Sequence, residues 1–292
     1  MSAATTDHVG EKSSKTTLLI RRIIAYVVLV LLTIISLLPF VIMIINSTRS
    51  HPDIMKGFKF VLGGSFGANF SAVFKNTDIP LLYGLRNSLI VAGCCALLST
   101  YFSALTAYGI HVYEFRLKKF AFAFILVIMM VPAQVSALGF YRMMFDLGLT
   151  NNLLPLIIPS IAAPATFFFM KQYMDSSLPL EIVEAARIDG CNEFRTFNSI
   201  VMPIMKPAMA VQGIFTFVAN WNNYFIPSLI IDEKELKTLP IMVAQLRSAD
   251  FLKFDMGQVY MMIFIAIIPV IIVYLALSKF IIRGIALGSV KG

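Results

Sequence analysis

The sequence predicts an all-α integral membrane protein with six transmembrane helices. Hydrophobic residues make up 58% of the 292 residues, charged residues make up 14%, and the mean hydropathy is +0.81. Soluble globular proteins are about 45–50% apolar and about 25% charged. The chain also contains six runs without Asp, Glu, Lys, Arg or His, each near or above the roughly 20 residues that cross a bilayer core. These runs leave no long stretch for a separate soluble domain.

The expected spans follow one another with polar connections between them. They are Ile23–Ile45, Asn87–Ile110, Phe120–Tyr141, Leu153–Met170, Pro207–Ile231 and Gly257–Ser278. Residues 1–17 are rich in Ser, Thr, Ala and charge, which predicts a disordered tail. The first run is too long for the core of a signal peptide and lacks a small-residue cleavage site, so we expect a span there. Residues 18–283 would form the transmembrane domain, and residues 284–292 a C-terminal tail.

Prolines are concentrated in the fourth run. Pro155, Pro159 and Pro164 lie there, whereas Pro132 and Pro269 lie alone in the third and sixth runs. A proline removes a backbone donor, and a membrane helix tolerates it where neighbouring groups satisfy the freed carbonyl. The fourth helix is therefore expected to be kinked or broken, as an ordinary proline kink or as a functional hinge.

Basic residues predict the orientation of the chain, because Lys and Arg collect in cytoplasmic loops. They lie before the first run, between the second and third runs and after the last run, at Lys12, Lys15, Arg21, Arg22, Arg116, Lys118, Lys119, Lys279, Arg283 and Lys291. With six spans these clusters share one side, so both termini and loop 178–203 are expected in the cytoplasm. Segments 46–86 and 232–256 are then external, and Arg49, Lys56, Lys59 and Lys75 in the first of them are an exception to the rule.

The sequence contains no motif of a self-contained enzyme or ATPase. It lacks G-x-x-x-x-G-K-[ST], H-E-x-x-H and a Ser-His-Asp set, so we expect no catalytic residue and no cofactor in this chain. Cys94, Cys95 and Cys191 lack metal-ligand spacing, so no metal site is expected. The net charge of +8 reflects the membrane flanks, and nucleic acid is not an expected partner. The runs hold no carboxylate for a proton relay, although a sodium-coupled carrier using carbonyls and hydroxyls stays open.

The polar stretch between the fourth and fifth runs predicts a short amphipathic helix. Pro179 suits its first position, and Glu181 and Glu184 lie in the opening turns, where acidic residues stabilise a helix N-terminus. One apolar face is expected from residues at three- and four-residue spacing: Leu178, Ile182, Val183 and Ala186. Ala185 and Ala186 carry little bulk, which would let a partner approach this helix closely.

A tight bend should follow this helix. Asp189 and Gly190 predict the end of the helix, with Gly190 in the left-handed conformation. Asn192 suits the N-cap of a second short helix that ends before Pro203. Two short helices around a bend form a projecting element that can insert into a groove on another protein or lie on the membrane surface.

Trp221, the only tryptophan, lies in the middle of the fifth run beside amide side chains. Its neighbours are Asn220, Asn222, Asn223 and Tyr224. Amides inside a membrane are costly unless they are paired, so they mark either contacts between helices or a polar path. A sugar needs hydrogen-bonding partners and an apolar ring to stack on, and this cluster offers both. Helix contact and translocation path are both acceptable interpretations.

The stretch from Glu184 to Pro203 also resembles the signature loop of permease subunits of binding-protein-dependent ABC importers. The residues of this loop that the resemblance assigns to ATPase coupling are Glu184, Ala185, Ala186, Asp189, Gly190, Ile200 and Pro203. Met202 stands where the family usually has Leu, a volume-conserving exchange. The similarity covers nearly all of the chain after the N-terminal tail, and it points to the second permease of maltose-type carbohydrate importers.

This resemblance implies the type I permease fold of ABC importers and a function in sugar or oligosaccharide uptake rather than in catalysis. Loop 178–203 would contain a coupling helix that enters a cleft on a separate ATPase. The C-terminal residues that would reach the ATPase interface are Gly288, Val290, Lys291 and Gly292. The implied partners are a second permease, two ATPase subunits that bind ATP-Mg, and an extracytoplasmic sugar-binding protein that docks on segment 232–256. The location would be the cytoplasmic membrane of a bacterium, and an ion-coupled secondary transporter is the alternative.

Overall fold

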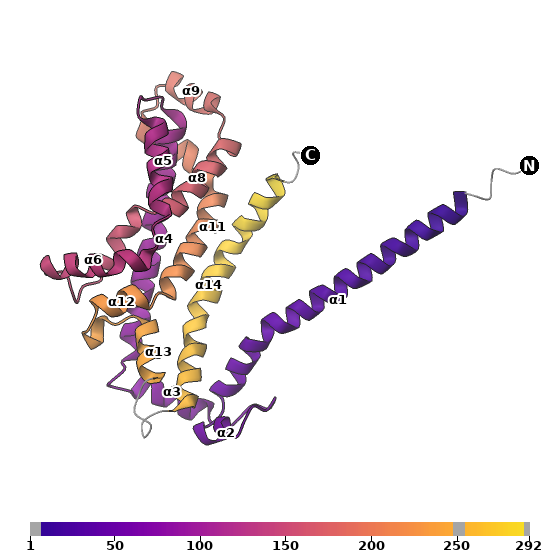
Figure 1. Cartoon of the computed structure of the whole chain (residues 1–292), viewed down its shortest axis with the longest axis vertical. Helices are drawn as coiled ribbons and strands as arrows, with labels where there is room; N and C mark the ends of the chain where they lie inside the picture. Colours follow the sequence, from indigo (N-terminus) through magenta and orange to yellow (C-terminus); the bar gives the residue numbers. More distant parts are fainter. Residues whose placement is uncertain (1–6, 248–254, 289–292) are drawn as a thin grey trace, which may run out of the picture. The chain divides into compact units, whose positions relative to one another are not determined.

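The described part of the chain is built entirely from helices. The computed structural model describes residues 7–247 and 255–288 (Figure 1). Within them, five helices are long and apolar enough to cross a membrane, or up to six if one bent pair counts as a single span. These five are Thr17–Ser47, Leu81–Val112, Leu154–Ser177, Glu193–Trp221 and Met256–Phe280. The predicted all-α membrane architecture is confirmed.

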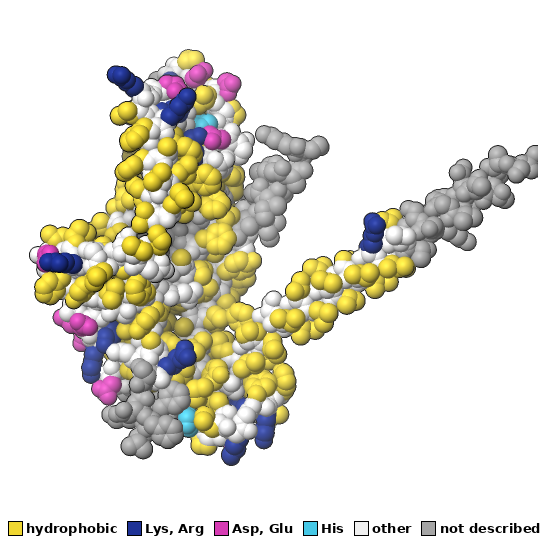
Figure 2. Space-filling view, viewed as in Figure 1, with side chains coloured by type: hydrophobic (Ala, Val, Ile, Leu, Met, Phe, Trp, Pro, Cys, Tyr) yellow, Lys and Arg dark blue, Asp and Glu magenta, His cyan; other side chains and the backbone are white. Residues whose placement is uncertain are grey.

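The helices group into two compact units, which we describe separately. The first comprises residues 1–70 and 256–264, and the second comprises residues 71–255 and 265–292. The first unit contains α1 (Asp7–Ser47), α2 (His51–Met55), the first half of α3 (Phe66–Lys75) and the opening turns of α14 (Met256–Gly288). From Leu18 onward, apolar side chains cover most of the exposed surface of α1 (Figure 2), a surface suited to hydrocarbon rather than to water.

Helix α1 begins earlier than the sequence predicted. The expected disordered tail spans residues 1–17, but residues 7–17 are helical, and residues 1–6 lie outside the described residues. Once a helix is nucleated, each added residue contributes one more hydrogen bond, so a long apolar helix extends readily into a neighbouring polar segment without proline. Residues 7–17 are thus helical in a segment where the sequence predicts a disordered tail.

The buried Arg49 organises the end of α1. Its guanidinium donates to Asn46 Oδ1 and to the carbonyl oxygens of Asp53 and Gly57. Asn69 Nδ2 donates to the carbonyls of Ser47 and Arg49, at 2.9 Å each. Arg49 was an exception among the residues expected outside the cytoplasm, and its hydrogen bonds explain it as a structural residue that satisfies loop carbonyls.

Helix α4 (Leu81–Val112) is the centre of the second unit. Helices α8 (Pro164–Ser177) and α11 (Met202–Trp221) pack along it. Ala104, Ala107, Phe167, Met170 and Met205 are among the buried residues of their shared core. Small residues on α4 let the other two helices approach closely, a common feature of packing in membranes. The remaining elements of this unit are α5 (Lys118–Met129), α6 (Ala133–Asp146), α7 (Leu154–Ile157), η1 (Ile158–Ile161), α9 (Leu180–Ile188), α10 (Glu193–Arg195), η2 (Thr196–Val201), α12 (Phe225–Ile230), η3 (Lys234–Leu236) and α13 (Leu239–Arg247).

The third and fourth runs are interrupted. The third run, predicted as one span, forms α5 and α6, which meet at an angle of 96° with Pro132 in the break (Figure 1). The predicted break in the fourth run is confirmed, because η1 and two non-helical residues separate α7 from α8. Each proline lacks an N–H, so the helical ladder is weakest at these points.

The last two spans have different limits from those predicted. The fifth span begins at Glu193 and ends at Trp221, whereas the apolar run predicted Pro207–Ile231. The residues after Trp221 form the separate short helix α12. Helix α14 continues to Gly288, so residues 284–288 of the predicted tail are helical and extend the last span.

Candidate functional site

Helix α9 and the bend after it have the predicted local geometry, except that Pro179 lies one position before the first helical residue. Pro179 is the N-cap of α9, Asp189 is its C-cap, and Gly190 has a φ of +78°. The N–H of Cys191 donates to the carbonyl of Ala186, and the N–H of Gly190 donates to that of Arg187, both at 3.0 Å. These two bonds form a Schellman motif, which requires a left-handed residue after the helix. The predicted roles of Gly190 as a stop and of Asn192 as a cap are confirmed, since Asn192 Oδ1 accepts from the N–H of Arg195 at 2.8 Å.

The two faces of α9 have different surroundings. Val183 and Ala186 are buried, and Val183 belongs to the core around α4 and α8. Glu184 and Ala185 are exposed. We define the outer face of α9 as Glu181, Glu184, Ala185 and Ile188, which are all exposed and spaced as one side of a helix. Among the described residues, Glu184 has no ion-pair partner.

The position of Ala186 corrects one expectation. Ala186 was expected to offer a small surface to a partner, but it is buried within this chain, because it belongs to the same apolar face as Val183. Sequence reasoning also missed two exposed apolar side chains beside the bend. Ile188 is 87% exposed and Phe194 is 73% exposed. Large exposed apolar residues beside a polar surface are typical of interaction sites, so these two residues extend the outer face of α9.

The second arm of the bend does not end before Pro203, as the sequence predicted. Helix α10 continues through the π-helical turn η2 into α11, so the arm and the fifth span form one continuous helix. Pro203 lies just after η2, and because a proline has no N–H, it interrupts the hydrogen-bond ladder of this helix at the π-helical turn. Ile200 is half-buried in η2. Any displacement of the bend therefore reaches the membrane without an intervening loop.

Electrostatic contacts stabilise the bend. Arg187, in the last turn of α9, pairs with Glu193 at 2.8 Å, and its guanidinium carbon lies 5.4 Å from the centre of the Tyr113 ring. The hydrogen bond to the Glu193 carboxylate raises the pKa of Arg187. Burial, followed by the hydrogen bond to Glu193, raises the pKa of Tyr113. These shifts favour the neutral phenol of Tyr113 and the charged guanidinium of Arg187.

The structure separates the predicted cluster around Trp221. Asn220 and Asn223 line a cavity of about 270 Å³ together with Ser136 and Phe140. Asn220 Nδ2 donates to the carbonyl of Thr216. Within the described residues, the side-chain amide of Asn223 and the hydroxyl of Ser136 have no hydrogen-bond partner. These two groups are free to bind a polar molecule in the cavity.

Trp221 does not face this cavity. It is 3% exposed, its ring stacks on Phe217 with centroids 5.6 Å apart, and its Nε1–H donates to the carbonyl of Ala266 at 3.1 Å. The expectation that Trp221 offers a ring for sugar stacking does not fit this burial. Asn222 and Tyr224 are exposed and are not among the lining residues of the cavity.

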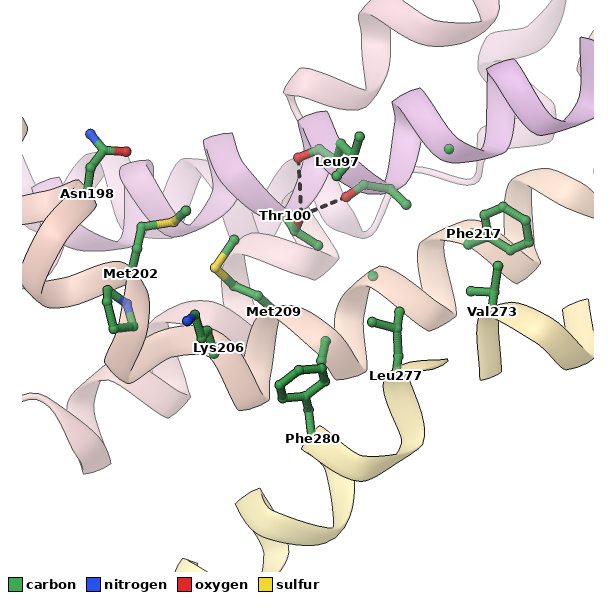
Figure 3. Close-up of a pocket in the computed structure, with 15 residues that line it drawn as sticks. Leu97, Thr100, Asn198, Met202, Lys206, Met209, Phe217, Val273, Leu277 and Phe280 are labelled. Atoms are coloured by element: carbon green, nitrogen blue, oxygen red, sulfur yellow. Dashed lines mark hydrogen bonds between the residues drawn. The ribbon is translucent and has the colours of Figure 1, made fainter. Parts of the chain in front are cut away.

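A larger cavity, of about 640 Å³, lies between α4, α11 and α14 (Figure 3). Its lining is mostly apolar and includes Leu97, Met209, Phe217 and Leu277. The polar exceptions include Asn198 and Lys206, near the bend, and Thr100, whose hydroxyl is already bonded to carbonyls of its own helix. Pro203 is also a lining residue, so this cavity adjoins the arm that leaves the bend.

The predicted C-terminal site is only partly visible. Gly288 is the last residue of α14. Val290, Lys291 and Gly292 lie outside the described residues, so the structure gives no geometry for them.

Comparisons with known proteins agree with this arrangement. The family model described as "Binding-protein-dependent transport system inner membrane component" matches residues 99–286, which include α9, the bend and α11. The arabinooligosaccharides transport system permease protein AraQ of Bacillus subtilis (strain 168) is 35% identical over 227 residues, 77% of this chain and 78% of AraQ. The lactose transport system permease protein LacG of Rhizobium radiobacter is 30% identical over 269 residues, 92% of this chain and 96% of LacG.

A solved structure shares the fold. One chain in the crystal structure of a bacterial ABC transporter involved in the import of the acidic polysaccharide alginate matches with a TM-score of 0.77 and 23% identity. The match covers 89% of this chain and 96% of that chain. The type I permease fold of ABC importers is thus confirmed. From the family match, the relatives and the fold together, this chain belongs to the inner membrane components of binding-protein-dependent transport systems, and it is a multi-pass permease subunit of an ABC importer rather than an enzyme.

Proposed function

We propose that this chain is one of two permease halves of a bacterial importer for sugars or oligosaccharides. The observation that carries the proposal is the outer face of α9, which lies within the family motif and stays uncovered while the opposite face is buried. A helix that ends in a Schellman bend and projects charged and apolar side chains is suited to insertion in a groove on another protein. The names of the relatives AraQ and LacG support a carbohydrate as the cargo.

In this proposal, the outer face of α9 docks on one of two ATPase subunits, which bind ATP-Mg. Glu184 supplies a charge at the contact, and Ile188 and Phe194 supply apolar area. Closure of the ATPases on ATP then moves the bend, and the continuous helix from α10 to α11 carries the movement into the membrane. The C-terminal residues Gly288, Val290, Lys291 and Gly292 contact the ATPases as well. Both termini lie in the cytoplasm.

On the other side of the membrane, an extracytoplasmic sugar-binding protein delivers the cargo to segment 232–256. The second permease completes the path. Asn220 and Asn223, which line the smaller cavity, are the residues of the original cluster best placed to contact a sugar. Trp221 stabilises the contact between α11 and α14 through its hydrogen bond to the carbonyl of Ala266.

Co-purification tests the proposal directly. The tagged chain is solubilised from its native membrane in mild detergent, as wild type, Glu184→Lys and Glu114→Lys. Glu114 is a matched control, because it is also exposed on the side expected in the cytoplasm but lies in the connection between α4 and α5. Charge reversal on the outer face of α9 disfavours docking, since a like or unpaired charge at an interface is penalised.

We expect wild type and Glu114→Lys to retain an ATPase and a second permease, and Glu184→Lys to lose the ATPase. Equal retention of the ATPase by Glu184→Lys would exclude the outer face of α9 as its dock. A wild-type chain that binds neither partner, and that alone moves a labelled mono- to tetrasaccharide into liposomes under a sodium gradient, would favour the secondary transporter.

A further inference from the structure

The C-terminal turns of α4 contact residues on either side of α9, the coupling helix of the proposed function. Tyr108 and His111 lie three residues apart, on one face of α4. Tyr108 reaches the residue that follows the bend, and His111 reaches the residue that precedes α9. Val183 of α9 belongs to the same buried core as Tyr108, so α9 is linked to α4 by this core at its middle and by hydrogen bonds to residues just before and just after it.

Glu193 is the centre of the first anchor. The buried Tyr108 donates its Oη–H to Glu193 Oε2 at 2.7 Å, and Arg187 donates its Nε–H to Glu193 Oε1 at 2.8 Å. A carboxylate only accepts hydrogen bonds, and it can serve two donors at once. One side chain on α10 therefore links α4 to the last turn of α9.

His111 is the centre of the second anchor. Its Nδ1 lies 2.8 Å from Asp175 Oδ1, and its Nε2 lies 3.0 Å from the carbonyl oxygen of Leu178. Lys171 also donates to Asp175, one turn earlier on α8. Leu178 is buried and immediately precedes Pro179, the N-cap of α9. The imidazole thus joins the ends of α4 and α8 to the start of α9.

We propose that Glu193 and His111 are positioning residues that fasten α9 to α4, so that the coupling helix and this central span move as one rigid body. The inference rests on the proposed function for its role in transport, but the mechanical claim concerns this chain alone. Neither residue belongs to the outer face of α9. Glu193 is turned towards Tyr108 and Arg187, and the imidazole of His111 is mostly covered.

Distance measurements between spin labels test the claim. Labels are placed at Leu89 on α4 and at Leu180 on α9 after the three native cysteines are replaced by alanine, and both positions are exposed. The rise of 1.5 Å per residue puts Leu89 about 30 Å along α4 from Tyr108, which suits the method. The variants are Glu193→Gln, Tyr108→Phe and His111→Ala, with Glu114→Gln as the control that breaks only the local pair with Lys118.

We expect one narrow distance distribution in the wild type, with the same mean in the permease alone, in the nucleotide-free complex and in the complex trapped with ATP and vanadate. Glu193→Gln, Tyr108→Phe and His111→Ala should lose the narrow distribution, and Glu114→Gln should keep it. The swap of Arg187→Glu with Glu193→Arg should restore it in part, because the pair is rebuilt with reversed charges. All variants should still retain the ATPase on co-purification, since the outer face of α9 is unchanged.

Narrow distance distributions with an unchanged mean in both Glu193→Gln and His111→Ala would show that these residues do not fasten α9 to α4. A broad distribution that the charge swap fails to narrow would also overturn the anchors, by showing a general loss of structure. Loss of the ATPase from Glu193→Gln with its distances unchanged would make Glu193 a docking residue instead. If the wild type retained no ATPase, the proposed function would fail, and the distances in the permease alone would still decide whether the anchors exist.

Discussion

The indole Nε1–H of Trp221 donates to the backbone carbonyl of Ala266 at 3.1 Å, which joins the last residue of α11 to the N-terminal part of α14. Pro269 lies inside α14 and has no N–H to donate to a carbonyl one turn earlier. The indole therefore bonds to α14 near Pro269, where the helical hydrogen bonding of α14 is already weakened. Trp221 stabilises the contact between these two spans, and the structure does not turn its ring towards a path for the cargo.

Replacing Trp221 with Phe should destabilise the permease without changing its choice of cargo. The variant keeps an aromatic ring against Phe217 but loses the hydrogen bond and part of the buried volume, a cost of about 2 kcal/mol. Thermal unfolding in detergent measures the loss. A change in relative uptake among a panel of labelled oligosaccharides, at unchanged stability, would instead support a direct sugar contact.

Asn223 and Asn222 offer a paired test of the smaller cavity. Asn223→Leu removes a free amide from the cavity wall, whereas Asn222→Leu changes an exposed neighbour that does not line it. If the cavity receives part of the sugar, uptake should fall about tenfold or more for Asn223→Leu, since a polar site that loses one hydrogen bond loses about 1.5 kcal/mol of binding. Uptake should stay near the wild-type level for Asn222→Leu. Equal uptake by the two variants would show that the smaller cavity does not bind the transported sugar.

Substitutions at Gly190 change the backbone strain of the bend without introducing a steric clash. Its φ of +78° disfavours other residues, while a Cβ at this position would meet nothing within 4 Å. Gly190→Ala should therefore cost about 1 kcal/mol of local stability, and Gly190→Asn should cost less, because Asn tolerates the left-handed conformation. Amide hydrogen exchange of residues 180–195 is the measurement. Exchange as slow in both variants as in the wild type would show that the bend does not depend on the conformation of residue 190.

Gly257 tests packing in the first unit. A Cβ at this position would lie 2.8 Å from the carbonyl oxygen of Arg49 and 2.8 Å from the amide of Asn69. Gly257→Ala must displace the hydrogen bonds around Arg49, and we expect a loss of about 2 kcal/mol in the free energy of unfolding. Gly67→Ala is the control, since its Cβ meets nothing within 4 Å. The melting temperature in detergent should fall for the first variant only.

The raised pKa of Tyr113 predicts that the contacts around the bend become less stable at alkaline pH. Burial and the hydrogen bond to Glu193 raise this pKa above the ordinary value of 10.0, so the neutral phenol is favoured in the folded state. The stabilisation is fully present below about pH 10 and is lost as the pH rises through the raised pKa. Tyrosinate absorbance in wild type and Tyr113→Phe isolates this residue. Glu193→Gln should shift its titration back towards 10, and an unchanged titration would contradict the contact.

The long apolar runs were sufficient to predict the fold class, because a bilayer requires helices of that length and hydrophobicity. The limits of the spans were less predictable. Hydropathy does not distinguish a helix that ends at Trp221 from one that continues to Ile231, since α12 is as apolar as α11. Pro132 marked the break between α5 and α6, but the angle of 96° depends on packing that a local pattern does not contain.

The candidate site was predictable where it depends on local geometry. The left-handed Gly190 and the Asn192 cap follow from neighbouring residues. The burial of Ala186 did not follow, because an apolar helix face is the same pattern whether this chain or a partner covers it. The anchor at Glu193 was missed for another reason, since its donor Tyr108 lies 85 residues away in the sequence.

The solitary Trp221 also has a spectroscopic consequence. As the only indole in the chain, it is the sole source of tryptophan fluorescence in the isolated permease. Its nearly complete burial predicts blue-shifted emission that is poorly quenched by water-soluble quenchers. Separation of α11 from α14 would break the hydrogen bond to Ala266 and shift the emission. The native protein thus carries an optical probe at one helix contact, which can follow the opening of these spans without any added label.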